Sequence, residues 1–75
     1  MFDWDYFNHE LEWVIEIPSG KKIEEIGVIE SVEVNEKNRR VYVKLKKHRM
    51  NQFFEERIRD IIQNMGYDPE VELED

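Results

Sequence analysis

Residues 28–46 read VIESVEVNEKNRRVYVKLK, and this stretch decides the fold. Apolar and polar residues alternate along Val28–Val34 and again along Arg40–Lys46. This alternation predicts two strands, because successive side chains of a strand point to opposite faces. The asparagines of the intervening segment Asn35–Asn38 suit a tight turn. The stretch therefore predicts a β-hairpin.

The register of this hairpin follows from its turn. A turn centred on residues 35–38 sets Val32 opposite Val41 and Val28 opposite Leu45, and it gives the two strands one apolar face. That face consists of Val28, Val32, Val34, Val41, Val43 and Leu45. It needs a layer of helices to cover it.

Glu30 is the acidic residue that this register places on the apolar face, opposite Val43. A buried carboxylate without a partner is costly, so we expect Glu30 to be paired, to lie near the end of the sheet or to be displaced by a bulge. A catalytic role is not favoured, because the pattern places no base or nucleophile beside it.

The covering helix follows the hairpin and has an apolar stripe at helical spacing. The stripe consists of Phe53, Phe54, Ile58, Ile61, Ile62 and Met65. Asn51 is suited to cap the start of this helix, and Gly66 is suited to end it. The next run, Glu70–Glu74, alternates glutamate with Val71 and Leu73, which predicts a last strand with these two side chains facing the core.

The N-terminal segment predicts a further helix, capped by Asp3. Its apolar residues recur at helical spacing and are Trp4, Phe7, Leu11, Val14 and Ile15. The end of this helix stays open, because residues 11–17 also alternate as a strand would before Pro18. Ser19–Gly27 is expected to be a loop anchored by its two isoleucines.

Together these elements predict one small α+β domain over residues 1–75, in the order helix, strand, strand, helix, strand. A mixed or antiparallel sheet packs on the helices in two layers. Charged residues make up 39% of the chain and apolar residues 40%, which favours a charged surface around a compact core over disorder. The abundance of Lys and Glu is also the compositional mark of heat-adapted proteins.

The composition disfavours several classes of function. A chain of 75 residues has few buried positions for a catalytic cleft, and this one contains no phosphate-binding glycine loop or nucleophile elbow. It has no cysteine, which excludes disulfides and thiolate chemistry. The acidic, aromatic N-terminal segment matches neither a signal peptide nor a membrane span. We therefore expect a non-enzymatic, cytoplasmic protein that needs no cofactor and binds no membrane.

Charge is divided unevenly along the chain. Seven of the eleven basic residues lie between Lys37 and Arg49, where no acidic residue occurs, although the whole chain has a net charge of −7. This block predicts a basic strand face for an anionic partner, with Tyr42 as a stacking surface for a base. Its candidate contact residues are Arg39, Arg40, Tyr42, Lys44, Lys46, Lys47 and Arg49.

The alternative is that these basic residues pair within the domain. In the register above Glu33 faces Arg40, and the glutamates of the last strand can lie beside Lys44 and Lys46. If the block binds a partner, an acidic protein surface ranks above nucleic acid, because the overall acidity of the chain repels a polyanion.

Aromatic residues gather at the N-terminus. Five of the nine occur in the first thirteen positions, namely Phe2, Trp4, Tyr6, Phe7 and Trp13. One helix cannot direct all of them to a single face, and Tyr6 and Trp13 lie off the apolar stripe. Trp4, Tyr6 and Trp13 are therefore the candidate contact residues of this segment for a protein partner or for a second copy of the chain.

A further pattern runs through the first half of the chain. Val14, Ile15 and Glu16 precede Gly20, and Ile23, Glu25, Ile26, Gly27, Val28 and Ile29 precede the strand Val32, Glu33 and Val34. With the elements that follow in the same order, the segment Val14–Glu74 resembles the small iron-sulfur cluster assembly domain family. That family includes the PaaD-like proteins and the cytosolic iron-sulfur targeting factors. The resemblance implies an α+β fold and a role as an accessory factor in metal or iron-sulfur assembly.

The chain departs from this family at two positions. The family's Asp-Pro-Glu is replaced at residues 16–18, and the segment that carries its cysteine becomes residues 46–50, with His48 where the cysteine falls. A thiolate role is thereby lost. The neighbouring Lys47 and Arg49 disfavour a protonated His48, which leaves a neutral imidazole able to bind metal. The alternative is a solvated loop histidine.

The sequence thus leaves three functional hypotheses. The first is a non-enzymatic interaction module that binds a protein or a second copy of itself through the aromatic N-terminus or the basic strand. The second is a metal or iron-sulfur assembly accessory factor that uses His48. The third is a nucleic-acid-binding protein that uses the basic strand over residues 39–49.

Overall fold

The computed structural model describes residues 1–16, 19–47 and 52–74. Its elements are α1 (Trp4–Leu11), α2 (Ile23–Ile26), β1 (Ile29–Asn35), β2 (Arg40–Lys46), α3 (Gln52–Asn64) and β3 (Asp68–Glu74). The predicted α+β order of helix, strand, strand, helix, strand is confirmed, with α2 as a one-turn addition. Asn51, the predicted cap of α3, lies outside the described residues. Within those ranges, none of the helices has the length and apolar character that a bilayer crossing requires.

Helix α1 begins where it was predicted and ends early. The Asp3 carboxylate accepts a hydrogen bond from the Tyr6 backbone N–H at 3.0 Å, which satisfies one of the free donors of the first turn. The helix stops at Leu11, and the chain then becomes extended, so that Ile15 forms a single β-bridge with Lys22. Of the two endings that the sequence left open, the early one is correct.

The prediction of a loop over Ser19–Gly27 is wrong in one place, because residues 23–26 form the helical turn α2. At its start, the Glu25 carboxylate accepts a hydrogen bond from the Lys22 backbone N–H at 3.3 Å. At its end, Gly27 has a φ of 75°, a left-handed value that glycine adopts without a steric penalty. A single turn is too short to produce a helical period in the sequence.

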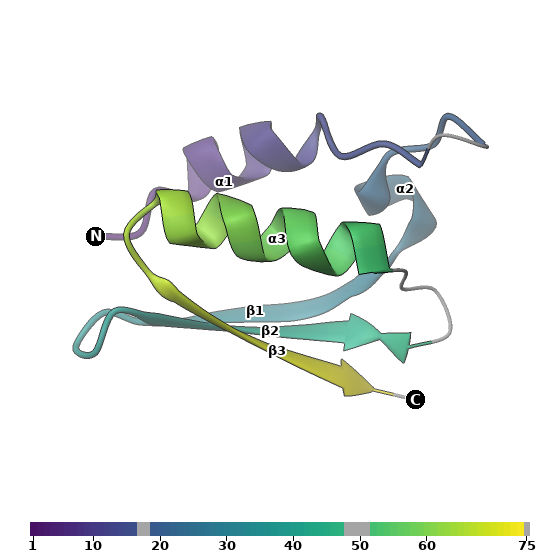
Figure 1. The fold of residues 1–75 in the computed structure, drawn as a ribbon. Helices are drawn as coiled ribbons and strands as arrows, with labels where there is room; N and C mark the ends of the chain where they lie inside the picture. Colours follow the sequence, from purple (N-terminus) through teal and green to yellow (C-terminus); the bar gives the residue numbers. More distant parts are fainter. Residues whose placement is uncertain (17–18, 48–51, 75) are drawn as a thin grey trace.

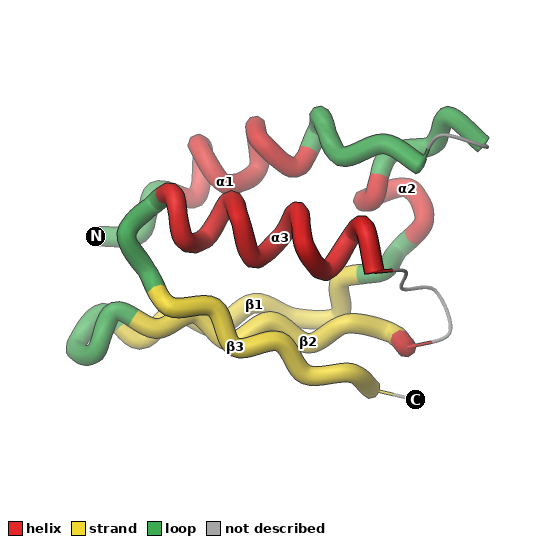
Figure 2. Tube along the Cα trace, viewed as in Figure 1, coloured by secondary structure: helices red, strands yellow, loops and turns green. Residues whose placement is uncertain are grey.

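The three strands form one mixed sheet in the order β1-β2-β3. Strands β1 and β2 are the antiparallel hairpin, and β3 pairs with β2 in parallel. Parallel neighbours need a long connection, and α3 supplies it by running back over the sheet between β2 and β3 (Figure 1). Helices α1 and α3 lie over the same face of the sheet, and no described helix covers the opposite face (Figure 2).

The predicted pairing of Val32 with Val41 is wrong by two residues, because Val34 faces Val41. Strand β1 extends to Asn35, whose side-chain oxygen accepts a hydrogen bond from the Lys37 backbone N–H at 3.1 Å, so the turn starts one residue later than expected. A shift of two residues leaves Val32, Val34, Val41, Val43 and Leu45 on their predicted face of the sheet. The predicted apolar face toward the helices is therefore confirmed.

Glu30 is displaced by a β-bulge, which is one of the three outcomes expected for it. The register shifts between Ile29 and Ser31, so Glu30 does not face Val43 as the predicted register required. Its carboxylate is exposed and lies 3.6 Å from the Lys46 ammonium. The bulge thus keeps a charged side chain out of the core.

The core lies between the helices and the sheet. Its largest fully buried side chains are Phe7, Phe54, Ile23, Leu45, Ile58, Ile62, Val14, Val28, Val41 and Val43. Four residues of the predicted apolar stripes and faces are instead 38–47% exposed, namely Trp4, Ile15, Phe53 and Leu73. Ile15 lies in the extended chain after α1, and the other three lie near one end of their helix or strand. Phe2 and Tyr67 are buried although the predicted stripes omit them, and their ring centroids lie 5.3 Å apart.

Gly66 terminates α3 as predicted. Its N–H donates to the Gln63 carbonyl oxygen at 3.0 Å, and the Tyr67 N–H donates to the Ile62 carbonyl oxygen at 3.2 Å, which is the bond pair of a Schellman motif. Gly66 has a φ of 88°, and an added Cβ would lie 3.2 Å from Nη2 of Arg39. The glycine therefore ends the helix and also leaves space for the hairpin turn to approach it.

Candidate functional site

The side of the sheet that faces away from α1 and α3, here called the open face, contains most of the predicted basic strand. Four predicted contact residues lie on it, namely Arg40, Tyr42, Lys44 and Lys46. They point there because they alternate with the buried Val41, Val43 and Leu45. Lys47 follows at the end of β2 and is exposed, and Arg49 lies outside the described residues. The structure thus brings these four side chains together on one surface.

Acidic strands flank this basic strand on both sides. The parallel register of β3 sets Glu72 beside Lys44 and Glu74 beside Lys46, which confirms that the last strand joins this part of the sheet. On the other side, Glu33 faces Tyr42 and not Arg40, because of the two-residue shift of the hairpin. Among the described residues of the three strands, the acidic side chains of the open face therefore outnumber the basic ones.

Two ion pairs cross the open face. Nη1 of Arg40 lies 3.3 Å from Oε1 of Glu70, and Nζ of Lys46 lies 3.6 Å from Oε2 of Glu30. All four side chains are about half exposed, and ion pairs in such positions contribute at most about 1 kcal/mol to stability. Their larger effect is on the surface charge, because they interrupt the continuous positive surface that a polyanion needs.

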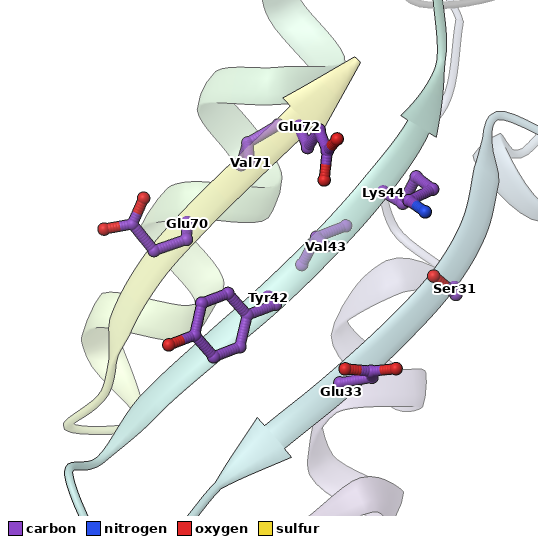
Figure 3. A pocket seen from close by; sticks show the side chains of 8 residues that line it. All are labelled: Ser31, Glu33, Tyr42, Val43, Lys44, Glu70, Val71 and Glu72. Carbon is purple, nitrogen blue, oxygen red and sulfur yellow. The ribbon is translucent and has the colours of Figure 1, made fainter. Parts of the chain in front are cut away.

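A shallow hollow of about 290 Å³ lies on the open face (Figure 3). Its lining residues are Ser31, Glu33, Tyr42, Val43, Lys44, Glu70, Val71 and Glu72. Figure 3 shows the Tyr42 ring on the central strand, with Glu70 on one side and Glu33 on the other. An aromatic ring bordered by carboxylates suits a cationic group better than a phosphate.

The three predicted contact residues of the N-terminal segment are all exposed, at 45% for Trp4, 41% for Tyr6 and 67% for Trp13. The Trp4 ring packs against the rings of Phe2 and Phe7 at centroid distances of 4.7 and 6.1 Å, so one side of the Trp4 ring contacts core residues. The Tyr6 hydroxyl is hydrogen-bonded to Glu10, which raises the pKa of Tyr6 above its ordinary value of 10.0. Trp13 is the most exposed of the three.

Trp13 borders a second hollow, of about 160 Å³, whose lining residues are Glu12, Trp13, Ile15 and Lys22. We call these four residues the Trp13 patch. Ile15 is itself 38% exposed, and the ring of His9 meets the Trp13 ring edge-on at a centroid distance of 6.3 Å. Exposed apolar side chains beside a charged rim are the composition of a protein contact site.

Glu36 joins three segments at the hairpin end of the domain. Its Oε1 accepts a hydrogen bond from the Tyr67 hydroxyl at 2.5 Å, and its Oε2 accepts one from the Phe2 backbone N–H at 2.6 Å. The Arg39 guanidinium lies over the Tyr67 ring, 4.7 Å from its centroid. The N-terminal segment and the α3–β3 turn are thereby fastened to the β1–β2 turn (Figure 1).

These contacts change the titration of both side chains. The Tyr67 hydroxyl, and after it the Phe2 N–H, hold the pKa of Glu36 below its ordinary value of 4.5. Conversely, the bond to Glu36 raises the pKa of Tyr67 above 10.0. Sequence patterns did not predict this contact, because the partners of Glu36 lie 31 and 34 residues away along the chain.

Comparison of the chain with protein-family models, with curated proteins and with solved structures gives no match. The resemblance to the iron-sulfur cluster assembly domain therefore rests on the residues of this sequence alone.

The predicted metal role of His48 concerns a residue that lies outside the described part of the chain. Among the described residues, no three His, Asp or Glu side chains gather as metal ligands do. The metal hypothesis stays a prediction of the sequence.

Proposed function

We propose that this protein is a non-enzymatic interaction module that binds another protein through the Trp13 patch. The observation that supports this most directly is the 67% exposure of Trp13, beside an Ile15 that is 38% exposed. Binding would remove this apolar area from water, which is favourable in proportion to the area buried. Tryptophan is also among the residues most enriched at the energetic centres of protein interfaces.

The backbone beneath the Trp13 patch is held by hydrogen bonds and by one buried side chain. Val14, between Trp13 and Ile15, is fully buried, and its carbonyl oxygen accepts a hydrogen bond from the Ile23 N–H at 3.0 Å. The Glu16 N–H donates to the Lys21 carbonyl oxygen at 2.9 Å. A patch held in one conformation before binding loses less conformational entropy on binding.

Nucleic acid is the weaker partner hypothesis. The open face has basic side chains on its central strand only, and Glu33, Glu70 and Glu72 lie on the strands beside it. Their charge opposes the phosphate contacts on which such binding depends.

The Trp13→Ala variant is expected to bind the partner about thirtyfold more weakly or worse, as interface centres of this kind contribute about 2 kcal/mol or more. The partner would first be identified by affinity purification with quantitative mass spectrometry, and its binding then measured by calorimetry with the recombinant protein. Tyr42→Ala is the matched control, because it removes an aromatic ring that is 42% exposed on the open face.

Recovery of the same proteins, in the same amounts, by the wild type and by Trp13→Ala would contradict the proposal. So would a partner that is lost with Tyr42→Ala and kept with Trp13→Ala, since that result places the site on the open face. Light scattering separates the two kinds of protein partner. A dimer that Trp13→Ala abolishes identifies the partner as a second copy of the chain.

A further inference from the structure

The outer edge of β3 is a candidate site separate from the Trp13 patch. Strand β3 pairs only with β2 in the described sheet, and Figure 1 shows no described element beyond it. The Asp68 N–H donates to the Arg39 carbonyl oxygen at 2.9 Å and so points toward β2. Because this direction alternates along a strand, the N–H and C=O groups of Val71 and Leu73 point outward.

Pro69 fits this arrangement. It occupies the outward-pointing position between Asp68 and Glu70, where its missing N–H removes no bond to β2. The outer edge therefore offers both a donor and an acceptor at Val71 and at Leu73. An extended chain that bonds to these groups adds a fourth strand to the sheet.

The side chains of β3 define which strand fits. On the open face, Glu70 is paired with Arg40, whereas Glu72 and Glu74 are exposed and directed away from the helices. On the helix side, Leu73 is 41% exposed at this edge, beyond which the described sheet has no further strand. A strand with basic residues on one face and apolar residues on the other pairs with these carboxylates and covers Leu73.

The same glutamates argue against a second copy of β3 as the added strand. Pairing two β3 edges brings the acidic rows of both copies together, and like charges opposite one another destabilise a strand pair. Charge repulsion thus disfavours pairing between two copies of β3, whereas a strand of opposite charge can still pair with this edge.

We propose that the β3 edge binds an extended peptide segment in which basic and apolar residues alternate. This goes beyond the proposed function, because it uses another surface and names the chemistry of its ligand.

Three synthetic peptides test this site on the full chain: KVKIKVK, the acidic EVEIEVE and KKVIVKK, which keeps the composition of the first without its alternation. We expect KVKIKVK to bind at least about tenfold more tightly than either control, as measured by calorimetry. Hydrogen exchange followed by NMR is expected to show slower exchange of the Val71 and Leu73 amides when KVKIKVK is bound.

Two variants test the residues of the edge. The double variant Glu72→Lys and Glu74→Lys is expected to weaken KVKIKVK binding about tenfold or more, since two attractive pairs become repulsive. The double variant Glu56→Lys and Asp60→Lys makes an equal change of charge at two exposed positions of α3, and this matched control is expected to leave binding unchanged.

Several results would overturn the proposal. Equal affinity for KVKIKVK and KKVIVKK would show attraction of charge without strand pairing, and unchanged exchange at Val71 and Leu73 in the bound state would show the same. A dimer of the free protein that protects these amides would assign the edge to a second copy of the chain.

Discussion

Replacing Phe54 by alanine is expected to lower the free energy of unfolding by about 3–5 kcal/mol, whereas replacing the adjacent Phe53 by alanine is expected to lower it by less than about 1 kcal/mol. Phe54 is fully buried and Phe53 is 47% exposed. The two changes are chemically identical and lie side by side in α3, so their effects on helix propensity nearly cancel. The difference between them isolates the burial of one ring.

This loss is large for so small a domain, since domains of this size have stabilities near the lower end of about 5–15 kcal/mol. Urea unfolding followed by far-ultraviolet circular dichroism measures both variants. If Phe54→Ala is unfolded without denaturant, Phe54→Leu keeps most of the apolar volume and gives a measurable transition. Equal losses of unfolding free energy at the two positions would contradict the assignment of Phe54 to the buried side of α3 and of Phe53 to its exposed side.

Acid is expected to destabilise the wild type more than the Tyr67→Phe variant. The Tyr67 hydroxyl is the largest cause that holds the pKa of Glu36 below 4.5. The unfolded chain, which lacks this contact, binds a proton at Glu36 more readily than the folded one. The contribution of Glu36 to stability is therefore present above the unfolded pKa and is lost as the pH falls through the folded pKa.

Thermal melting between about pH 7 and about pH 3 tests this expectation. The Tm difference between the wild type and Tyr67→Phe is expected to be largest near neutral pH and to shrink in acid. Tyr42→Phe is the matched control, because it removes a hydroxyl from an exposed tyrosine, and its Tm is expected to run parallel to that of the wild type. A difference between the wild type and Tyr67→Phe that stays constant over this range would contradict the role of Glu36.

At alkaline pH, the contribution of Tyr67 to stability depends on pH in the opposite direction. The pKa of Tyr67 is raised above 10.0 by the bond to Glu36, so the folded state keeps the phenol proton where the unfolded chain releases it. That contribution is complete below the unfolded pKa of the tyrosine and is lost as the pH rises through the folded one.

The parts of the fold that depend on one element were predictable from the sequence. Alternation along β1 and β2 identifies the buried valines, and the apolar stripe of α3 identifies its buried isoleucines. Burial of one face makes apolar residues recur with the period of the strand or of the helix. Alternation repeats every two residues, so it fixes the face of a side chain but not the register, and Val34 rather than Val32 faces Val41. Helix α2 has a single turn and leaves no period to detect.

The candidate surfaces were predictable to the same extent. Tyr6 and Trp13 lie off the helical stripe, and both are exposed. The acidic flank of β2 depends on where β3 joins the sheet, which a strand pattern alone does not decide. The sequence places Glu36 in the hairpin turn. Its neighbours in the sequence do not indicate that its carboxylate accepts a hydrogen bond from the distant Tyr67 hydroxyl.

The parallel pairing of β2 with β3 also sets an order in which the chain assembles. The β1–β2 hairpin closes through a short turn and forms in about 1–10 μs by itself. Arg40 and Asp68 meet only after the long intervening segment has closed, so we expect β3 to join the sheet after β1 and β2 have paired. Its glutamates then approach a strand rich in arginine and lysine, and we expect this attraction to favour the pairing of β3 with β2.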